Sequence, residues 1–413
     1  MIDKKMLVLG VATLVLGLTS CGGGGKAADL TYWCPAGDNA IMDTLVAKFK
    51  EAYPDYAEKN IKRAGNYGED SVYAQLHKDL DAAADVALIA DDQIRTGVKA
   101  EELTKFDASD VARVTASDGA LAVAACSTST GMYGLPYRAD NAPMPFYDST
   151  FFTTAPTKLE EVLSQAKAAN KKVYLDMGNG WYNAFMLWNG GAEFGISHDN
   201  KLYTNAADSS VIDGVANLLD GMKSLYNEYK DIWESSSDTA KIQAGFKSGN
   251  IVYAFCWNDP LIFSSKESVK VATWPSVNIG GVDKALHCFQ GYKAVICKYQ
   301  EAGERLDLAK DFARFLSSET AQELRATEMQ QGPSNTAVFN RTKDSLPFAG
   351  PVGTMALEGR THPQATSVTS DFWDPMGALG AVVINGKDNW GTYNSAKAAI
   401  RALVSTSGWT NLP

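Results

Sequence analysis

The spacing of apolar residues along the chain predicts alternating strands and helices. Apolar side chains recur at helical spacing over 41–53, where Pro54 ends the pattern, and again over 211–225 and 308–316. Thr157 and Glu160 have the spacing of a capping box at the start of one more helix. Short apolar runs predict strands over 30–33, 85–90, 173–177, 251–256 and 269–274, the last as a candidate strand crossing between lobes. This alternation favours an α/β architecture in which helices cover parallel sheets.

The first twenty residues have the features of an export signal. A short basic start precedes an apolar run over 6–18, about a dozen residues, which is the length of a signal segment rather than of a spanning helix. Leu18-Thr19-Ser20-Cys21 then resembles the lipobox of bacterial lipoproteins, which implies lipidation of Cys21. A plain signal peptide that happens to end at a cysteine is the alternative. We therefore expect a lipoprotein signal peptide over 1–20 and a Gly-rich tether over 21–28.

The remaining chain has the size and composition of a globular protein with two lobes. About 385 residues follow the tether, more than one hydrophobic core usually serves. The sequence is 45% hydrophobic and 21% charged, and no further apolar run reaches the length of a membrane span. A formal net charge of −10 argues against nucleic acid as a partner.

The cysteines and histidines do not have metal-site spacing. Cys34, Cys126, Cys256, Cys288 and Cys297 form an odd set without a C-x-x-C motif, so we expect small buried side chains rather than zinc ligands. A bridge between Cys288 and Cys297 stays open. The four histidines are scattered, and neither a serine-hydrolase nor a dinucleotide-binding motif is present. The sequence therefore predicts neither a metal nor a cofactor.

A series of motifs resembles the solute-binding proteins of ABC importers, and specifically the maltose-binding-protein-like group that takes up sugars. The motifs are Leu30-Thr31-Tyr32-Trp33, 49–54, 85–93, 133–137 running into 145–148, 246–250, 309–320 and 331–335. Each motif is weak alone, but their order and spacing extend over nearly all of the mature chain. The resemblance implies a two-lobed periplasmic-binding-protein-like fold of type II, with discontinuous lobes joined by a hinge.

The same resemblance implies how the chain is divided and where it works. The N-terminal lobe would use 29–137 and 275–340, and the C-terminal lobe 138–274 and 341–413. Ligand binding would close the lobes over the cleft between them, and the permease subunits of the importer would respond to that closure. We expect a monomer, lipid-anchored to the cell membrane on its extracytoplasmic side, which is the periplasmic side if the envelope is Gram-negative.

Aromatic residues in polar surroundings are the first candidates for ligand contacts. Trp181 and Tyr182 follow a Gly-Asn-Gly segment, Trp257 precedes Asn-Asp, and Trp373 lies between acidic residues. By position these residues resemble the aromatic sugar platforms of the group, whereas packing in the core or at its rim is the alternative.

Charged residues near predicted strand ends are the second candidates. Asp38 and Asp92 follow strands at the end where open α/β sheets place ligands, and they match acidic sugar-binding positions of the group. A helix cap or a solvated loop acid is the alternative for each. Arg138 and Asp140 at the first crossover are further candidates, although they could simply pair with each other.

These features predict a carrier of a sugar or oligosaccharide, similar to a maltose or maltodextrin carrier, and not an enzyme. A polyamine or other small cation is an alternative ligand, because Asp38, Asp92 and Asp140 with tryptophans would form an acidic aromatic cage. A secreted glycosidase is a further alternative, although the pattern selects no pair of carboxylates.

Overall fold

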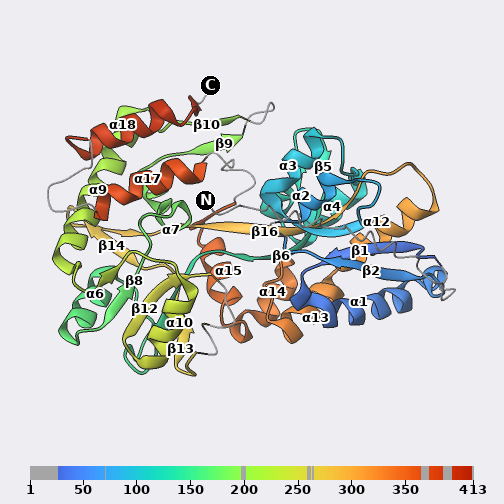
Figure 1. Ribbon diagram of the computed structural model, residues 1–413, viewed down its shortest axis with the longest axis horizontal. Coiled ribbons are helices and arrows are strands. Elements are labelled where there is room, and N and C mark those ends of the chain that lie inside the picture. The colour runs from blue at the N-terminus through green and yellow to red at the C-terminus, as the bar shows by residue number, and fades with distance from the viewer. Residues whose placement is uncertain are drawn as a thin grey trace, which may run out of the picture.

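Two α/β lobes lie side by side in the computed structural model (Figure 1). The structure describes residues 27–69, 71–196, 201–257, 262, 265–363, 372–384 and 393–411. The predicted signal peptide and Cys21 lie outside these ranges. Among the described residues, no helix is both long and apolar enough to cross a membrane.

The sheet of the first lobe is mixed rather than wholly parallel as the sequence predicted. Its strands are β1 (Leu30–Cys34), β2 (Ile61–Asn66), β3 (Val86–Ala90), β6 (Leu135–Asn141), β16 (Cys288–Cys297) and β17 (Thr361–Pro363). The order is β17-β16-β3-β1-β2, and β6 also pairs with β16. β1 runs parallel to β2 and β3, whereas β16 runs antiparallel to β3 and β6. The antiparallel direction arises because the chain returns through β16 from the second lobe.

Helices cover this sheet and close the first core. They are α1 (Asn39–Ala52), α2 (Val72–Lys78), α3 (Asp91–Lys99), α4 (Ala108–Ser117), α5 (Ala120–Ala125), α12 (Glu304–Leu316), α13 (Glu319–Met329) and α14 (Thr336–Thr342). The predicted helix over 41–53 is α1, and it packs on α12 through Phe49 and Phe312, whose ring centroids are 5.2 Å apart. Segments far apart in the sequence therefore build one core.

The second lobe has its own mixed sheet, in the order β11-β8-β12-β7-β13. Its strands are β7 (Met144–Asp148), β8 (Lys172–Tyr174), β11 (Trp233–Glu234), β12 (Ile251–Cys256) and β13 (Val269–Val271). β8 runs parallel to β11 and β12, and β7 runs antiparallel to β12 and β13. Smaller pairings involve β4 (Ser127–Thr128), β5 (Gly131–Met132), β9 (Phe194–Ile196), β10 (Leu202–Thr204), β14 (Ser276–Ile279), β15 (Val282–Ala285) and β18 (Thr410–Asn411).

Helices from two distant parts of the chain complete the second core. They are α6 (Leu159–Ala168), α7 (Gly180–Asn183), α8 (Phe185–Asn189), α9 (Ser209–Tyr229), α10 (Thr239–Ser248), α15 (Ala349–Leu357), α17 (Trp373–Ile384) and α18 (Ala396–Thr406). The predicted helix over 211–225 is part of α9, whose apolar face packs in this core. Lys223 of α9 is buried and donates a hydrogen bond to the carbonyl oxygen of Val382, near the end of α17.

Strand β16 belongs to both cores. Its first residues, including Phe289, pack in the second core, whereas Tyr292 and the residues after it pack in the first. Val277 and Ile279, which the sequence assigned to the first lobe, also pack in the second core. We therefore place the proposed lobe boundary within β16 rather than at residue 275.

Two local predictions were wrong. The segment 269–274 is not a crossing strand, because β13 lies at the edge of the second sheet beside β7. The capping box at Thr157 does not form either: α6 begins after Lys158 without a side-chain cap, and Glu160 instead accepts a hydrogen bond from the backbone N–H of Asn278 at 2.6 Å.

The five described cysteines are free and buried, which agrees with their prediction as small core residues. Cys288 and Cys297 begin and end the same ten-residue strand. An extended strand of that length separates its ends by about 30 Å, so a bridge between these two residues is ruled out.

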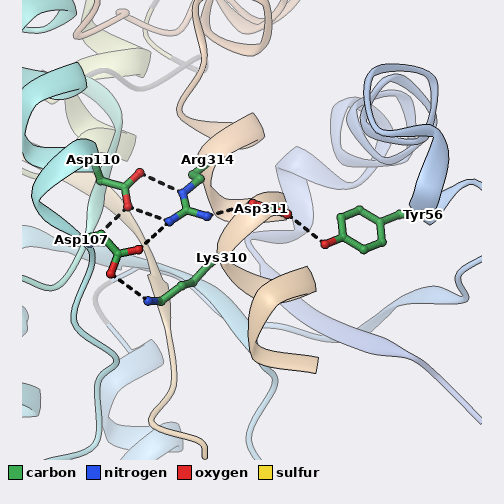
Figure 2. Close-up of polar contacts among 6 residues, drawn as sticks. All are labelled: Tyr56, Asp107, Asp110, Lys310, Asp311 and Arg314. Atoms are coloured by element: carbon green, nitrogen blue, oxygen red, sulfur yellow. Dashed lines mark hydrogen bonds and ion pairs between the residues drawn. The ribbon is translucent and has the colours of Figure 1, made fainter. Parts of the chain in front are cut away.

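A charged network holds α4 against α12 in the first lobe (Figure 2). Asp107 and Asp110 form a reciprocal capping box at the start of α4. Arg314 donates two hydrogen bonds to Asp110 and one each to Asp107 and Asp311, all at 2.9 Å. Burial alone raises the pKa of Asp110, but the hydrogen bonds from Arg314 outweigh it and hold that pKa below its usual value.

Candidate ligand-binding site

Three of the predicted tryptophans form one aromatic cluster in the second lobe. Trp181 and Trp373 stack with ring centroids 4.3 Å apart and planes 8° from parallel. Trp257 meets Trp181 edge-on at 4.6 Å, and Phe289 of β16 meets Trp373 at 4.5 Å. All three tryptophans are half-buried. The sequence did not identify Phe289, because Gln290, Gly291 and Lys293 interrupt the apolar pattern of its strand, which was not predicted.

Close contact between α7 and α17 creates this stack. A Cβ atom on Gly180 would lie 2.5 Å from the carbonyl oxygen of Trp373, so only glycine permits the approach. Asn183 then ties the two segments together, donating hydrogen bonds to the carbonyl oxygens of Met177 and Met376, both at 2.8 Å. Asn179 caps α7 by accepting a hydrogen bond from the N–H of Trp181.

Tyr182, which the sequence predicted as a ligand contact, lies on a different side of α7 from Trp181. Its side chain is 0% exposed within the second core, so it presents no surface to a ligand. Burial raises its pKa far above the usual value, and its hydroxyl has no hydrogen-bond partner among the described residues. The Gly-Asn-Gly context that suggested exposure for Tyr182 instead serves the packing of α7 on α17.

Asp38 belongs to a polar group in the first lobe that also contains Tyr137, Arg138, Asp140 and Gln331. It lies in a short 3-10 helix (Ala36–Asp38) directly after β1 and is 5% exposed. Its Oδ1 accepts a hydrogen bond from Gln331 at 2.9 Å, and its Oδ2 accepts a longer one from the hydroxyl of Tyr137 at 3.3 Å. Burial raises the pKa of Asp38, while the charge of Arg138 opposes that shift.

Arg138 and Asp140 pair with each other at the crossover, as the sequence left open. Arg138 Nε donates to Asp140 Oδ1 at 2.6 Å, and Asp140 Oδ2 accepts from the N–H of Gly332 at 2.7 Å. Asp140 is fully buried, so its carboxylate is committed to these contacts. Arg138 keeps 19% of its side chain exposed and faces Asp38 and Glu69, a neighbour that the sequence did not single out.

Asp92 lies in the first turn of α3, directly after β3, and is half-buried. Its place at the carboxyl end of a parallel strand matches the prediction for Asp92. The nearby Glu69 comes from the loop before α2, and its carbonyl oxygen accepts a hydrogen bond from the N–H of Ala90. The sequence around Glu69 has neither helical nor strand periodicity, so the sequence did not select this residue.

The aromatic cluster contacts β16 through Phe289, and the polar group contacts β6 through Arg138. Phe289 and Lys293 point to the same side of β16 because they are four residues apart. Lys293 lies opposite Arg138 of β6, and the register of the two strands shifts on both sides of this pair. About 13 Å of strand separates Phe289 from that pair. The predicted contacts other than Tyr182 and the buried Asp140 are thus compatible with one elongated site.

A hollow of about 260 Å³ lies on the opposite face, where Gln290 and Tyr292 project. Its polar groups are bonded within the protein: Gln290 bonds Ala139 and Thr361, and Asp118 accepts hydrogen bonds from Gln322 and Ser334. Such a lining offers few polar groups to a ligand rich in hydroxyls, so the aromatic face is the better candidate site.

Two histidines form a pair beside the aromatic cluster. His287 Nδ1 lies 2.9 Å from His362 Nε2, and His362 stacks on Trp188 with centroids 4.1 Å apart. Burial and then His287 lower the pKa of His362 to about 3. Among the described residues, no group of three or more acidic, histidine or cysteine side chains could hold a metal ion.

Solved structures share this architecture. The chain is similar to the maltodextrin-binding protein MalE1 from L. casei BL23 without ligand, with 17% identity, a TM-score of 0.76, and coverage of 92% of this chain and 98% of that chain. A cyclo/maltodextrin-binding protein complexed with maltotetraose gives 18% identity and a TM-score of 0.71, with 93% and 97% covered. The MalE protein of Listeria monocytogenes in complex with maltose gives 14% identity and a TM-score of 0.71, with 92% and 96% covered.

These likenesses confirm the predicted two-lobed fold of type II, which is that of a solute-binding protein. The sequence model for the bacterial extracellular solute-binding proteins matches residues 44–346, so this chain belongs to that family. A comparison with curated protein sequences finds no match.

Proposed function

We propose that this protein is the extracytoplasmic substrate-binding component of an ABC importer and that it captures a maltodextrin-like oligosaccharide. The observation that carries the proposal is that β6 and β16 contact both parts of the site: Phe289 of β16 packs on the stacked tryptophans, and Arg138 of β6 bonds Asp140 and acts on Asp38. The proteins of similar fold whose structures contain maltose or maltotetraose support this ligand class.

The two ends of the site suit the two surfaces of a sugar. The C–H faces of a pyranose ring pack on indole rings, and the half-buried Trp181 and Trp257 are candidates for this contact. Sugar hydroxyls need donors and acceptors that are already oriented, because an unpaired buried polar group costs about 1–3 kcal/mol. Asp38 and Arg138 are oriented in this way by their neighbours. A span of about 13 Å between the ends accommodates an oligosaccharide better than a single ring.

Charge pairing makes a polyamine the weaker alternative. The acidic cage expected for a cation would need carboxylates without countercharge. Asp140 is instead paired with Arg138, and Arg138 also lowers the pKa of Asp38 against the effect of burial. Asp38 and Asp140 therefore share a countercharge, which weakens their attraction for a cation.

The remaining parts of the proposal concern location and mechanism. The lipobox-like segment ending at Cys21 supports anchoring of a monomer to the cell membrane on its extracytoplasmic side. Sugar binding between the lobes would favour the closed state, which the permease subunits recognise. The binding role that the family has, together with the absence of any selected acid–base pair in the pattern, supports a carrier that is not an enzyme.

A thermal-shift screen of the full chain in mild detergent tests the proposal. Maltotriose at a hundred times its dissociation constant should raise the free energy of unfolding by about 2.7 kcal/mol, whereas spermidine should not. Trp257→Ala should abolish the response. Trp233→Phe is the matched control, because this tryptophan lies in the same core and bonds Leu175 outside the cluster. A response to spermidine alone would support the cation carrier, and release of reducing ends from maltotriose would reveal a glycosidase.

A further inference from the structure

Arg325 of α13 is a fully buried arginine directly behind Asp38. It is 1% exposed, and its guanidinium lies 3.7 Å from the centroid of the Tyr137 ring. Its Nη1 donates to the carbonyl oxygen of Leu316 at 2.8 Å, and its Nη2 donates to that of Tyr137 at 2.7 Å. Both acceptors are neutral, so among the described residues no carboxylate neutralises Arg325 by direct contact.

The side chain of Arg325 fixes one of the two donors that Asp38 uses. The guanidinium both covers the ring of Tyr137 and bonds its backbone, so neither the ring nor the strand can move independently. Burial raises the pKa of Tyr137 far above its usual value, so its hydroxyl stays protonated. That hydroxyl donates to Asp38 Oδ2.

The backbone of Arg325 fixes the other donor. Its carbonyl oxygen accepts hydrogen bonds from the N–H groups of Gln330 and Gln331 at the end of α13. Gln330 holds a left-handed conformation there, with φ of 55°, and this turn directs the next residue back toward β1. The side chain of Gln331 then donates to Asp38 Oδ1.

A buried positive charge without a contacting carboxylate is costly, so packing alone does not account for an arginine at this place. An uncharged residue of similar length would fill the space without that cost. The charged neighbours of Arg325 include Asp38, Arg138 and Asp118. The carboxylate of Asp38 is itself 5% exposed, and Arg138 and Glu69 also act on it. The opposite charges of Arg325 and Asp38 therefore lower the cost of burying each other.

We propose that Arg325 is the positioning residue of the site: it orients both hydrogen-bond donors of Asp38 and, together with Arg138, provides positive charge near this buried carboxylate. Asp38 then serves only as an acceptor, and beyond the bonds from Gln331 and Tyr137 it retains lone pairs that can accept from a ligand hydroxyl. The ligand part of this inference rests on the proposed sugar-binding function, whereas the charge part does not.

The first experiment needs no ligand. Urea unfolding of the full chain is measured at pH 5.0, 6.0 and 7.5 for the wild type, Arg325→Met and Arg325→Met with Asp38→Asn. Burial already raises the pKa of Asp38, and loss of Arg325 raises it further. Protonation of Asp38 then removes an uncompensated charge from the folded state as the pH falls. The midpoint deficit of Arg325→Met should shrink by at least half between pH 7.5 and 5.0, and Asp38→Asn should abolish that dependence.

The second experiment uses maltotriose as the probe and variants that keep the packing. Tyr137→Phe retains the ring beneath Arg325 but removes the donor to Asp38, and Arg325→Lys retains charge without the two-pronged contact. Calorimetry should show that each variant binds maltotriose at least about tenfold more weakly than the wild type. Tyr137→Phe removes a hydrogen bond to the charged Asp38, and Arg325→Lys displaces the donor of that bond. The loss in Tyr137→Phe should deepen at pH 5.5. Arg314→Lys, in the same lobe but bonded to other carboxylates, should leave affinity unchanged.

The outcomes separate the two proposals. A wild-type protein that does not bind maltotriose contradicts the sugar function, and the ligand-free series still decides the role of Arg325. A deficit in Arg325→Met that is independent of pH, or that keeps its pH dependence with Asp38→Asn, overturns the positioning role. If Arg325→Met does not fold, unchanged affinity in both Tyr137→Phe and Arg325→Lys overturns it instead.

Discussion

A single methyl group on Gly180 should separate the two stacked tryptophans. The Cβ of Gly180→Ala would lie 2.5 Å from the carbonyl oxygen of Trp373 and 3.1 Å from the Cβ of Met376, and the first of these partners is backbone. Ordinary contacts begin at 3.4 Å, so α7 and α17 must move apart by about 0.9 Å. Overpacking of this kind costs about 1–3 kcal/mol. Because Trp181 follows Gly180 directly, the same displacement opens the aromatic stack.

Gly178→Ala is the matched control in the same loop. Its Cβ would meet only Asp176 Oδ1 at 3.5 Å, an ordinary contact, and its backbone does not need glycine. Urea unfolding should show a loss of about 1–3 kcal/mol for Gly180→Ala and of less than about 0.5 kcal/mol for Gly178→Ala. Maltotriose affinity should fall about tenfold, or about 1.4 kcal/mol, for Gly180→Ala alone. Equal stability and equal affinity for the two variants would refute the close-packing explanation of the stack.

Three further predictions concern charge and backbone strain. Arg314→Met should lower the free energy of unfolding by about 2–3 kcal/mol at pH 7, because it strands the buried carboxylate of Asp110. Because the folded state lowers the pKa of Asp110, the stabilisation by the Asp110–Arg314 pair is present above pH 3.8 and is lost below it. Urea unfolding at pH 3 should therefore show a smaller loss of stability for Arg314→Met than at pH 7. An equal loss at both pH values would contradict the role of the pair. The pKa of His362 is lowered to about 3, so the free energy of unfolding should fall by up to about 1.4 kcal/mol per pH unit as the pH drops below 6.5. His362→Gln should reduce this pH dependence. An unchanged pH dependence in His362→Gln would exclude the His287–His362 pair as its source. Gln330→Gly should raise the midpoint of thermal unfolding, equivalent to about 0.5–1 kcal/mol, because glycine adopts the left-handed conformation without strain; a lower midpoint would show that the Gln330 side chain contributes contacts instead.

The sequence predicted the elements whose apolar pattern is local. The helix over 41–53 is α1, and the strand over 251–256 is β12, because periodicity within one segment determines which side chains are buried. The strand over 173–177 is shorter than predicted, since β8 ends at Tyr174 although Leu175 and Met177 remain buried. Burial without strand pairing has no separate signature in the apolar pattern.

Features that depend on distant partners were not predictable in this way. Thr157 and Glu160 have the spacing of a capping box, but the Glu160 carboxylate instead accepts a hydrogen bond from a backbone N–H of β14. Strand β16 was also missed, because Gln290, Gly291 and Lys293 interrupt its apolar pattern and only the fold shows that its two ends pack in different cores.

In the candidate site, too, local sequence features were predictable and features that depend on distant partners were not. Trp181, Trp257 and Trp373 were found from their polar neighbours in sequence and do lie together. Tyr182 shares that neighbourhood but points the opposite way, since adjacent helical residues face different sides. Arg325 was invisible, because a lone arginine in an amphipathic helix is usually a surface residue and only the fold brings it behind Asp38.

The interleaving of the two cores determines when each can form during synthesis. The first core contains Leu30 and Ala321, which are 291 positions apart in the sequence. At about 5–20 residues per second, the ribosome needs about 15–58 s to deliver the second of these residues after the first. For most of that time the first core lacks β16 and α12 and stays incomplete. An export channel that accepts only unfolded chains therefore has most of the translation time to engage the predicted signal over 1–20.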